Sequence, residues 1–167
     1  GESIVGKSPR EIIKAGISMS FIPEDRLGMG LVASMDMVDN IILKEYQNQK
    51  GIFIDRKPAK RLAKDLIEKL DIKTPGIHHP IRQLSGGNIQ KVLLGREIQS
   101  NPRILITAYP VRGLDIGSSY TIYDLINQQK AKDVAVLFIG EDLDVLIELC
   151  DRIMVLCDGK ITGILDS

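Results

Sequence analysis

The sequence predicts an α/β protein in which a mostly parallel sheet is flanked by helices and interrupted by a helical segment. In the second half of the chain, apolar runs of strand length over 104–106 and 134–139 alternate with a helical pattern around 122–126. The layer looks incomplete at its N-terminal side, because a doubly wound sheet normally has a central strand that feeds a phosphate loop, and only a few residues precede the first helix here. We therefore expect an α/β core portion of residues 1–29 and 86–167 and a helical subdomain of residues 30–85.

Composition and charge limit the classes of function that this chain could have. The 167 residues suffice for about one domain, and 44% hydrophobic with 26% charged residues is ordinary for a globular protein. Twenty-two basic residues balance twenty-two acidic ones, so no net field favours nucleic acid or an anionic membrane. Cys150 and Cys157 form no C-x-x-C pair, and no apolar run approaches the roughly 18 residues of a membrane helix. We expect a cytoplasmic protein with no nucleic-acid partner and no metal site, because His78 and His79 lack a third ligand in sequence.

The first half begins with a capped helix. Ser8-Pro9-Arg10-Glu11 is a capping box with proline at the first helical position, so a short helix is expected to about Ala15. An alternating strand over Ile17–Ile22 follows and ends in the turn sequence Pro23-Glu24-Asp25-Arg26, which leads into a glycine-rich polar loop. Two further helices are predicted, over Ile41–Tyr46 and from Pro58 to Leu70.

The second half alternates between helices and strands. A serine and two glycines within 84–88 begin a helical pattern that fades near Ser100. The continuous apolar run Val134–Ile139 is typical of a strand buried on both faces. The chain is completed by a helix over Leu143–Leu149, a strand over Ile153–Leu156, an Asp158-Gly159 hairpin turn and a strand over Ile161–Ile164.

Two glycine patterns match nucleotide-binding motifs but lack the required context. Gly1 to Ser8 satisfies the G-x-x-x-x-G-K-S phosphate-loop pattern, yet no strand precedes it in the sequence, and Pro9 follows where a long helix should already run. Gly28 to Ala33 imitates the dinucleotide fingerprint, but five residues separate it from its strand and no clear helix opens on it. We interpret Ser8 as a helix cap and the second match as chance.

A third glycine pattern, Leu84 to Lys91, has the context that its chemistry requires. Gly86 and Gly87 let the backbone approach an anion closely, and the following helix directs its unpaired N–H groups and positive dipole end at the same point. The hydroxyl of Ser85 adds a donor, with an ordinary serine-glycine helix start as the alternative. The pattern predicts phosphate binding.

The octet L-S-G-G-N-x-Q-K, followed by an apolar strand, Pro110 and Arg112-Gly113-Leu114-Asp115, resembles the nucleotide-binding domains of ABC transporters. Within that family, Pro23 to Arg26 and Gly113 to Gly117 are similar to the second, C-terminal cassette of the double-cassette proteins that serve sugar and nucleoside importers. Thr74-Pro75 looks more like the nucleoside branch. The resemblance covers essentially the whole chain and implies a partial ABC-type P-loop NTPase core whose phosphate-loop strand is missing.

The resemblance implies roles for individual residues. Glu24 stands where the family has its Q-loop glutamine, and the stretch from Glu24 to about Tyr46 is similar to the surface that receives the permease's coupling helix. Asp115 corresponds to the D-loop aspartate, which lies across the cassette interface. The signature motif, which in the family contacts the γ-phosphate of ATP held by the opposite cassette, corresponds to Ser85, Gly86 and Gly87, with Asn88 and Gln90 as weaker companions.

The departures from the family pattern concern catalysis. The strand that ends at Thr107 should be followed by an aspartate for Mg²⁺ and a glutamate that polarises water, but the sequence has Ala108 and Tyr109. Alanine has no polar atom and a phenol is protonated at neutral pH, so neither group coordinates a hard cation or accepts a proton there. Glu141 occupies the position of the switch histidine and would repel a γ-phosphate. We expect no catalytic residue in this chain and a silent ATP site of its own.

The function expected from the sequence is that of an ATP-binding cassette fragment of an ABC importer for sugars or nucleosides, with ATP and Mg²⁺ held mainly by the partner cassette. The expected partners are a second nucleotide-binding half or cassette, transmembrane permease subunits and, indirectly, a substrate-binding protein. The expected location is cytoplasmic and peripheral, on the inner face of the cell membrane.

Two alternatives and one structural consequence accompany this expectation. The first alternative is a soluble ABC-type ATPase without a permease, although the long coiled coil or basic patch that would favour it is absent from the sequence. The second is a small self-contained NTPase that uses Gly1–Ser8. If the central strand is missing, neighbouring strands should present unpaired edges and apolar faces that dimerisation, swapping or rearrangement would cover.

Overall fold

The computed structural model describes residues 3–46, 49 and 53–166 of the 167-residue chain. The elements in chain order are α1 (Pro9–Lys14), β1 (Met19–Ile22), η1 (Arg26–Gly30), α2 (Met37–Glu45), α3 (Lys57–Lys69), η3 (Ile81–Gln83), α4 (Gly86–Gln99), β2 (Ile104–Ala108), α5 (Ile116–Lys130), β3 (Ala135–Ile139), α6 (Leu143–Leu149), β4 (Arg152–Cys157) and β5 (Lys160–Asp166). The short element η1 is a π-helical turn and η3 is a 3-10 turn.

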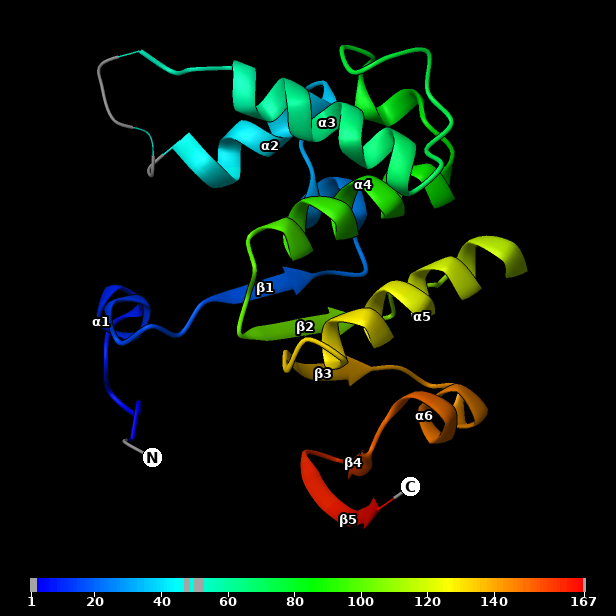
Figure 1. Ribbon diagram of the computed structural model, residues 1–167. Coiled ribbons are helices and arrows are strands. Elements are labelled where there is room, and N and C mark those ends of the chain that lie inside the picture. The colour runs from blue at the N-terminus through cyan, green and yellow to red at the C-terminus, as the bar shows by residue number, and fades with distance from the viewer. Residues whose placement is uncertain (1–2, 47–48, 50–52, 167) are drawn as a thin grey trace.

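Strands β1, β2 and β3 form a parallel sheet in that order. Met19 pairs with Ile104 and Ile104 with Ala135, and the register continues until Ala108 lies beside Ile139. Because the strands are parallel, their carboxyl ends lie on one edge of the sheet, on the right in Figure 1. Helix α4 packs against β1, and α5 packs against β3. The expected α/β class with a parallel sheet is confirmed.

The C-terminal strands β4 and β5 form an antiparallel hairpin that does not pair with the other sheet within the described residues. Asp158 and Gly159 both have positive φ, 48° and 73°, as a two-residue type I′ turn requires. The Asp-Gly signal therefore predicted this hairpin correctly.

Capping side chains set the starts of the first helices. The Ser8 hydroxyl accepts from the N–H of Glu11 at 3.4 Å, and the Glu11 carboxylate accepts from the N–H of Ser8 at 2.7 Å, which confirms Ser8 as the cap of α1. Helix α2 begins at Met37, earlier than predicted, because Asp36 caps it by accepting from the N–H of Asp39 at 2.7 Å. Gly28, the start of the apparent dinucleotide pattern, lies inside η1.

The prediction that 134–139 forms a strand buried on both faces is wrong. Side chains alternate along β3, so Val136 and Phe138 pack toward the core while Leu137 is 47% exposed. Met19 of β1 is 58% exposed on the same side of the sheet. Within the described residues α4 and α5 cover the other side. An apolar run in the sequence shows which side chains a strand carries, but not whether other elements pack on both of its faces. We call the uncovered side the open face, and its large exposed side chains are Met19, Phe21, Leu137 and Ile139.

One hydrophobic core joins the sheet to the helical segment. Ile22 of β1 and Leu105 of β2 belong to the same buried cluster as Ile41 of α2, Leu66 of α3 and Leu93 of α4. Full burial of each such side chain contributes roughly 1.5–3 kcal/mol. Because one core spans the sheet and the helical segment, it marks no boundary between them. The division into residues 1–29 and 86–167 and residues 30–85 stays a prediction.

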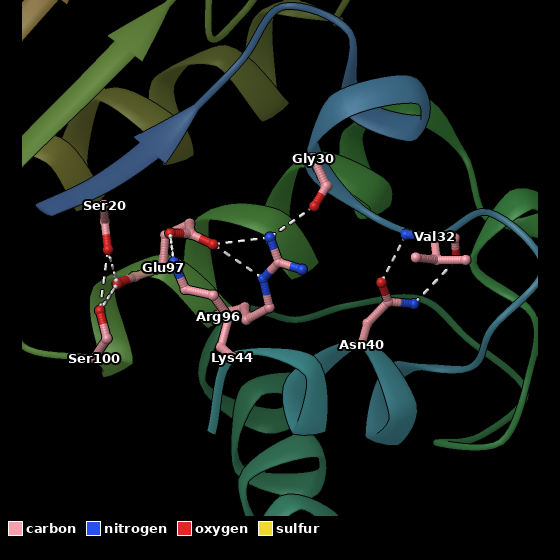
Figure 2. Close-up of polar contacts among 8 residues, drawn as sticks. All are labelled: Ser20, Gly30, Val32, Asn40, Lys44, Arg96, Glu97 and Ser100. Carbon is pink, nitrogen blue, oxygen red and sulfur yellow. Dashed lines mark hydrogen bonds and ion pairs between the residues drawn. The ribbon is translucent and has the colours of Figure 1, made fainter. Parts of the chain in front are cut away.

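Charged and polar groups are buried at the C-terminal half of α4 (Figure 2). The carboxylate of Glu97, 1% exposed, pairs with the guanidinium of Arg96 at 2.8 Å and with the ammonium of Lys44 at 2.7 Å. The bond to Lys44 ties α4 to α2. The remaining bonds of the cluster join α4 to η1 and β1: Arg96 donates to the carbonyl of Gly30 at 2.7 Å, and Ser20 and Ser100 donate to the carbonyl of Glu97 at 2.9 and 2.7 Å.

Candidate functional site

The sequence Ser85-Gly86-Gly87, here called the serine-glycine turn, forms the start of the 14-residue helix α4, with Ser85 exposed and the two glycines half-buried. The Ser85 hydroxyl caps the helix by accepting from the backbone N–H of Asn88 at 3.4 Å and from its side-chain amide at 2.8 Å. The first amides of an α-helix have no intrahelical acceptor, and the dipole places partial positive charge at the same end. The turn therefore presents backbone donors and a serine hydroxyl to solvent.

The start of helix α5 lies directly beside this turn. A Cβ atom built on Gly87 would lie 2.5 Å from the Ser118 hydroxyl and 3.8 Å from a carboxylate oxygen of Asp115, so a side chain there would require Ser118 to move. Asp115 caps α5 by accepting from the N–H of Ser118 at 2.9 Å and from its hydroxyl at 2.6 Å. These hydrogen bonds lower the pKa of Asp115. Figure 1 shows both helices starting at the edge where the parallel strands end.

Asn88 and Gln90 both bond to other parts of the fold, and only Gln90 is buried. Asn88 links the turn to the end of the helical segment, because its carbonyl oxygen accepts from the N–H of Lys73 at 2.9 Å. Gln90 is fully buried, and its carbonyl oxygen accepts from Nε of Arg26 at 2.8 Å. The side chain of Gln90 therefore lies beneath the turn and does not face a ligand at the surface.

Arg26 joins segments that the sequence analysis treated separately. Besides Gln90, its guanidinium donates to the backbone carbonyl of Arg112, and Arg112 forms an ion pair with Glu24. The pKa of Arg26 is lowered, because the effect of partial burial exceeds the opposing effect of the nearby charge of Glu24. The sequence signal for these contacts was limited to the turn residues 23–26, which carry no information about partners more than sixty residues away.

At the carboxyl end of β2, positions 108 and 109 carry no carboxylate. Ala108 lies beside Ile139 in the register, and the N–H of Tyr109 donates to the carbonyl of Ile139 at 2.8 Å. Tyr109 has a φ of 48°, and the guanidinium of Arg112 lies 5.8 Å from its ring centroid. Glu141 is exposed after β3. A cavity of about 190 Å³ at this edge is lined by Tyr109, Arg112, Tyr123, Phe138, Glu141 and Asp142 among others.

The side chains at positions 108 and 109 do not fit a magnesium site. Mg²⁺ requires oxygen ligands, commonly one or two carboxylates. A methyl group and a phenol that lies against a guanidinium supply none. The backbone and hydroxyl donors of the serine-glycine turn fit a phosphate. The start of α4 and the carboxyl end of β2 therefore differ in the ligand that their groups could hold.

The arrangement of a parallel sheet, two adjacent helix starts and an attached helical segment recurs in solved structures. The dimeric post-hydrolysis structure of the ATP-binding cassette MJ0796 bound to ADP and Pi matches with a TM-score of 0.78 at 20% identity, over 96% of this chain and 68% of that chain. The ADP conformation of MJ1267, an ATP-binding cassette of an ABC transporter, matches with a TM-score of 0.71 at 22% identity, over 100% and 67%. The chain therefore has the fold of an ABC ATPase cassette, as a partial domain.

The proteins with similar sequences belong to the same class as the proteins with similar folds. The xylose import ATP-binding protein of Moorella thermoacetica is 39% identical over 163 residues, and a putative ribose/galactose/methyl galactoside import ATP-binding protein of Hahella chejuensis is 40% identical over 169. They cover 98% and 99% of this chain, which spans about a third, 32%, of either relative. No family model matches. The chain is thus a homologue of sugar import ATP-binding proteins, which confirms the resemblance to ABC cassettes. Within residues 3–46, 49 and 53–166, no helix has the length and apolar character needed to cross a membrane.

Proposed function

We propose that this chain is part of the second, C-terminal ATP-binding cassette of an ABC importer for sugars, and that its serine-glycine turn completes an ATP site held by a partner cassette. The observation that carries the proposal is the exposure of Ser85 at the start of α4, with Gly86 and Gly87 beside the start of α5. The xylose and ribose/galactose importers named above supply the substrate class. Nucleosides stay an alternative substrate class.

In this proposal Ser85, Gly86 and Gly87 bind the terminal phosphate of the partner's ATP. The amides and the positive end of the α4 dipole face the anion without reorganisation, and the serine hydroxyl turns its proton toward a phosphate oxygen while its lone pairs keep the helix cap. Asp115 holds the start of α5 at the same interface through its bonds to Ser118. Glu24 and the residues that follow it face the permease subunits, and the substrate-binding protein acts indirectly through them.

The hydrolytic groups belong to the partner cassette. A missing general base costs roughly 10²- to 10⁴-fold in rate, whereas a missing donor to a developing charge costs roughly 10²- to 10³-fold. Ala108 and Tyr109 supply neither a base nor a magnesium ligand, and the carboxylate of Glu141 repels a phosphate on this chain's own side. Bound Mg²⁺ would neutralise the ATP phosphates, and its ligands must come from the other half.

The first prediction is that the isolated chain does not hydrolyse ATP and does not bind a fluorescent ATP analogue tightly in the presence of Mg²⁺. The helix that follows Ser8, α1, has only six residues and none of them is buried, so it is not the long packed helix that a phosphate loop needs. Steady phosphate release that Lys7→Ala abolishes would contradict this prediction and favour the self-contained NTPase.

Association with a partner tests the proposal itself. The partner is the phosphate-loop cassette of the same importer, with its catalytic glutamate replaced by glutamine so that ATP persists. We expect sedimentation to show a complex with ATP and much weaker association with ADP, because the turn contacts the γ-phosphate. Equal association in both nucleotides would refute the role of the turn.

A further inference from the structure

The guanidinium of Arg26 lies where three segments of the chain meet. Its Nε donates to Gln90 of α4 at 2.8 Å, and its Nη2 donates to the carbonyl of Arg112, in the loop between β2 and α5. Its Nη1 is the group nearest to the side-chain direction of Gly86, because a Cβ built on that glycine would lie 3.6 Å from it. One planar group thus bonds to the helix and to the loop and lies beside the turn.

The contact with Gln90 is an internal one. Gln90 is fully buried, and its Nε2 has no hydrogen-bond partner within the described residues. Its carbonyl oxygen depends on Arg26. Loss of Arg26 would leave both ends of a buried amide unpaired, which costs far more than losing an exposed bond. The geometry of Arg26 is therefore fixed from beneath the turn.

The neighbours of the turn restrict its movement. On one side of the turn, Ser118 at the start of α5 occupies the space into which a side chain at Gly87 would point, and α5 packs against α4. The bonds from Arg26 to Gln90 and to the Arg112 carbonyl oppose separation of α4 from the loop that leads to Asp115.

We propose that Arg26 is a positioning residue for the serine-glycine turn. Its forked guanidinium fixes the start of α4 relative to the β2–α5 loop, so that Ser85 and Asp115 are presented together. The ligand of the turn follows from the proposed function above, whereas the positioning follows from the contacts. Arginine is required because the compact ammonium of lysine cannot donate in two directions from a rigid plane.

The variant Arg26→Lys keeps the charge and removes the fork. Two measurements follow it: hydrogen exchange of the Ile89 amide, which donates to the Ser85 carbonyl at 2.9 Å, and the dissociation constant for the ATP-loaded partner cassette, corrected for the folded fraction. We expect exchange at Ile89 to become about tenfold faster and the dissociation constant to rise about tenfold, as the loss of a charge-assisted hydrogen bond predicts.

Two control variants separate positioning from stability. Arg112→Gln removes the ion pair with Glu24 but keeps the backbone carbonyl that Arg26 uses, so we expect both measurements near the wild-type values. Asn40→Ala removes a buried amide that bonds to both backbone groups of Val32, so it should lower the melting temperature without loosening the turn.

The outcomes distinguish this inference from the proposed function. If Arg26→Lys resembles Asn40→Ala, with a lower melting temperature but an unchanged dissociation constant per folded molecule, the positioning role is wrong. Unchanged exchange at Ile89 also overturns it, whether or not the chain associates with a partner. If the wild-type chain does not associate with the ATP-loaded cassette but Arg26→Lys still loosens Ile89, the proposed function fails and the positioning stands.

Discussion

The two ends of α4 use polar groups in opposite ways. At its C-terminal half, Arg96 and Glu97 are buried and bonded to β1, η1 and α2. At its start, Ser85 is exposed and the adjacent glycines are half-buried. The comparison shows a helix whose C-terminal half is anchored in the fold while its capping residue, Ser85, is exposed. Stability and binding should therefore respond to different residues of one helix.

Glu97→Ala should produce the largest effect and break the anchored end. It leaves the buried guanidinium of Arg96 without its carboxylate, and removal of one partner of a buried pair costs about 3–5 kcal/mol in the free energy of unfolding. Urea denaturation of the wild type and the variant measures this loss. Glu97→Gln, which keeps the shape and one acceptor, should lose less. A loss below about 1 kcal/mol for Glu97→Ala would mean that the anchor contributes little.

Ser85→Asp should produce the next largest effect and act on the open end alone. Aspartate caps a helix as well as serine does and suits the positive end of the dipole, so the free energy of unfolding should stay within about 0.5 kcal/mol of the wild-type value. The added negative charge repels a phosphate, so ATP-dependent association should weaken by about a hundredfold or more. The matched control is Ser85→Asn, which also caps the helix but stays neutral and should bind better than the aspartate variant. Equal binding by both variants would exclude a phosphate at the turn.

The cap of α5 gives the smallest expected effect, and it depends on pH. The folded-state pKa of Asp115 is lowered by its bonds to Ser118, so its contribution to stability is present above the unfolded pKa of about 3.9 and is lost as the pH falls through the folded value. Asp115→Asn should therefore be slightly less stable than the wild type near pH 6, and the difference should disappear at pH values well below 4. Thermal melts across that range measure it. A difference that grows with acid would contradict the sign.

Local signals in the sequence predicted what local chemistry controls. The capping box at Ser8, the serine-glycine start of α4 and the Asp158-Gly159 hairpin each depend on residues within a few positions, and each was correct. The contacts of Arg26 with Gln90 and of Lys44 with Glu97 cross more than fifty residues, so no periodicity could reveal them. The exposed side of β3 was missed for the same reason, since coverage depends on what packs there.

In the candidate site, too, some features followed from the local sequence and others required the tertiary structure. The donors at Ser85, Gly86 and Gly87 were identified from their own spacing and the helix that follows. The proximity of Asp115 to Gly87 and the burial of Gln90 required the packing of α4 against α5 and η1. The motif therefore predicted a chemistry for the turn, and the fold showed that Ser85 is exposed and Gln90 is buried.

The open face of the sheet has a practical consequence for every measurement on this chain. Met19, Phe21, Leu137 and Ile139 offer water an apolar surface that a second molecule can cover at sufficient concentration. Where a second molecule covers this surface, folding and self-association become linked equilibria, and the apparent melting temperature then depends on the protein concentration. Comparisons between variants are meaningful only when made at matched concentrations or extrapolated to infinite dilution.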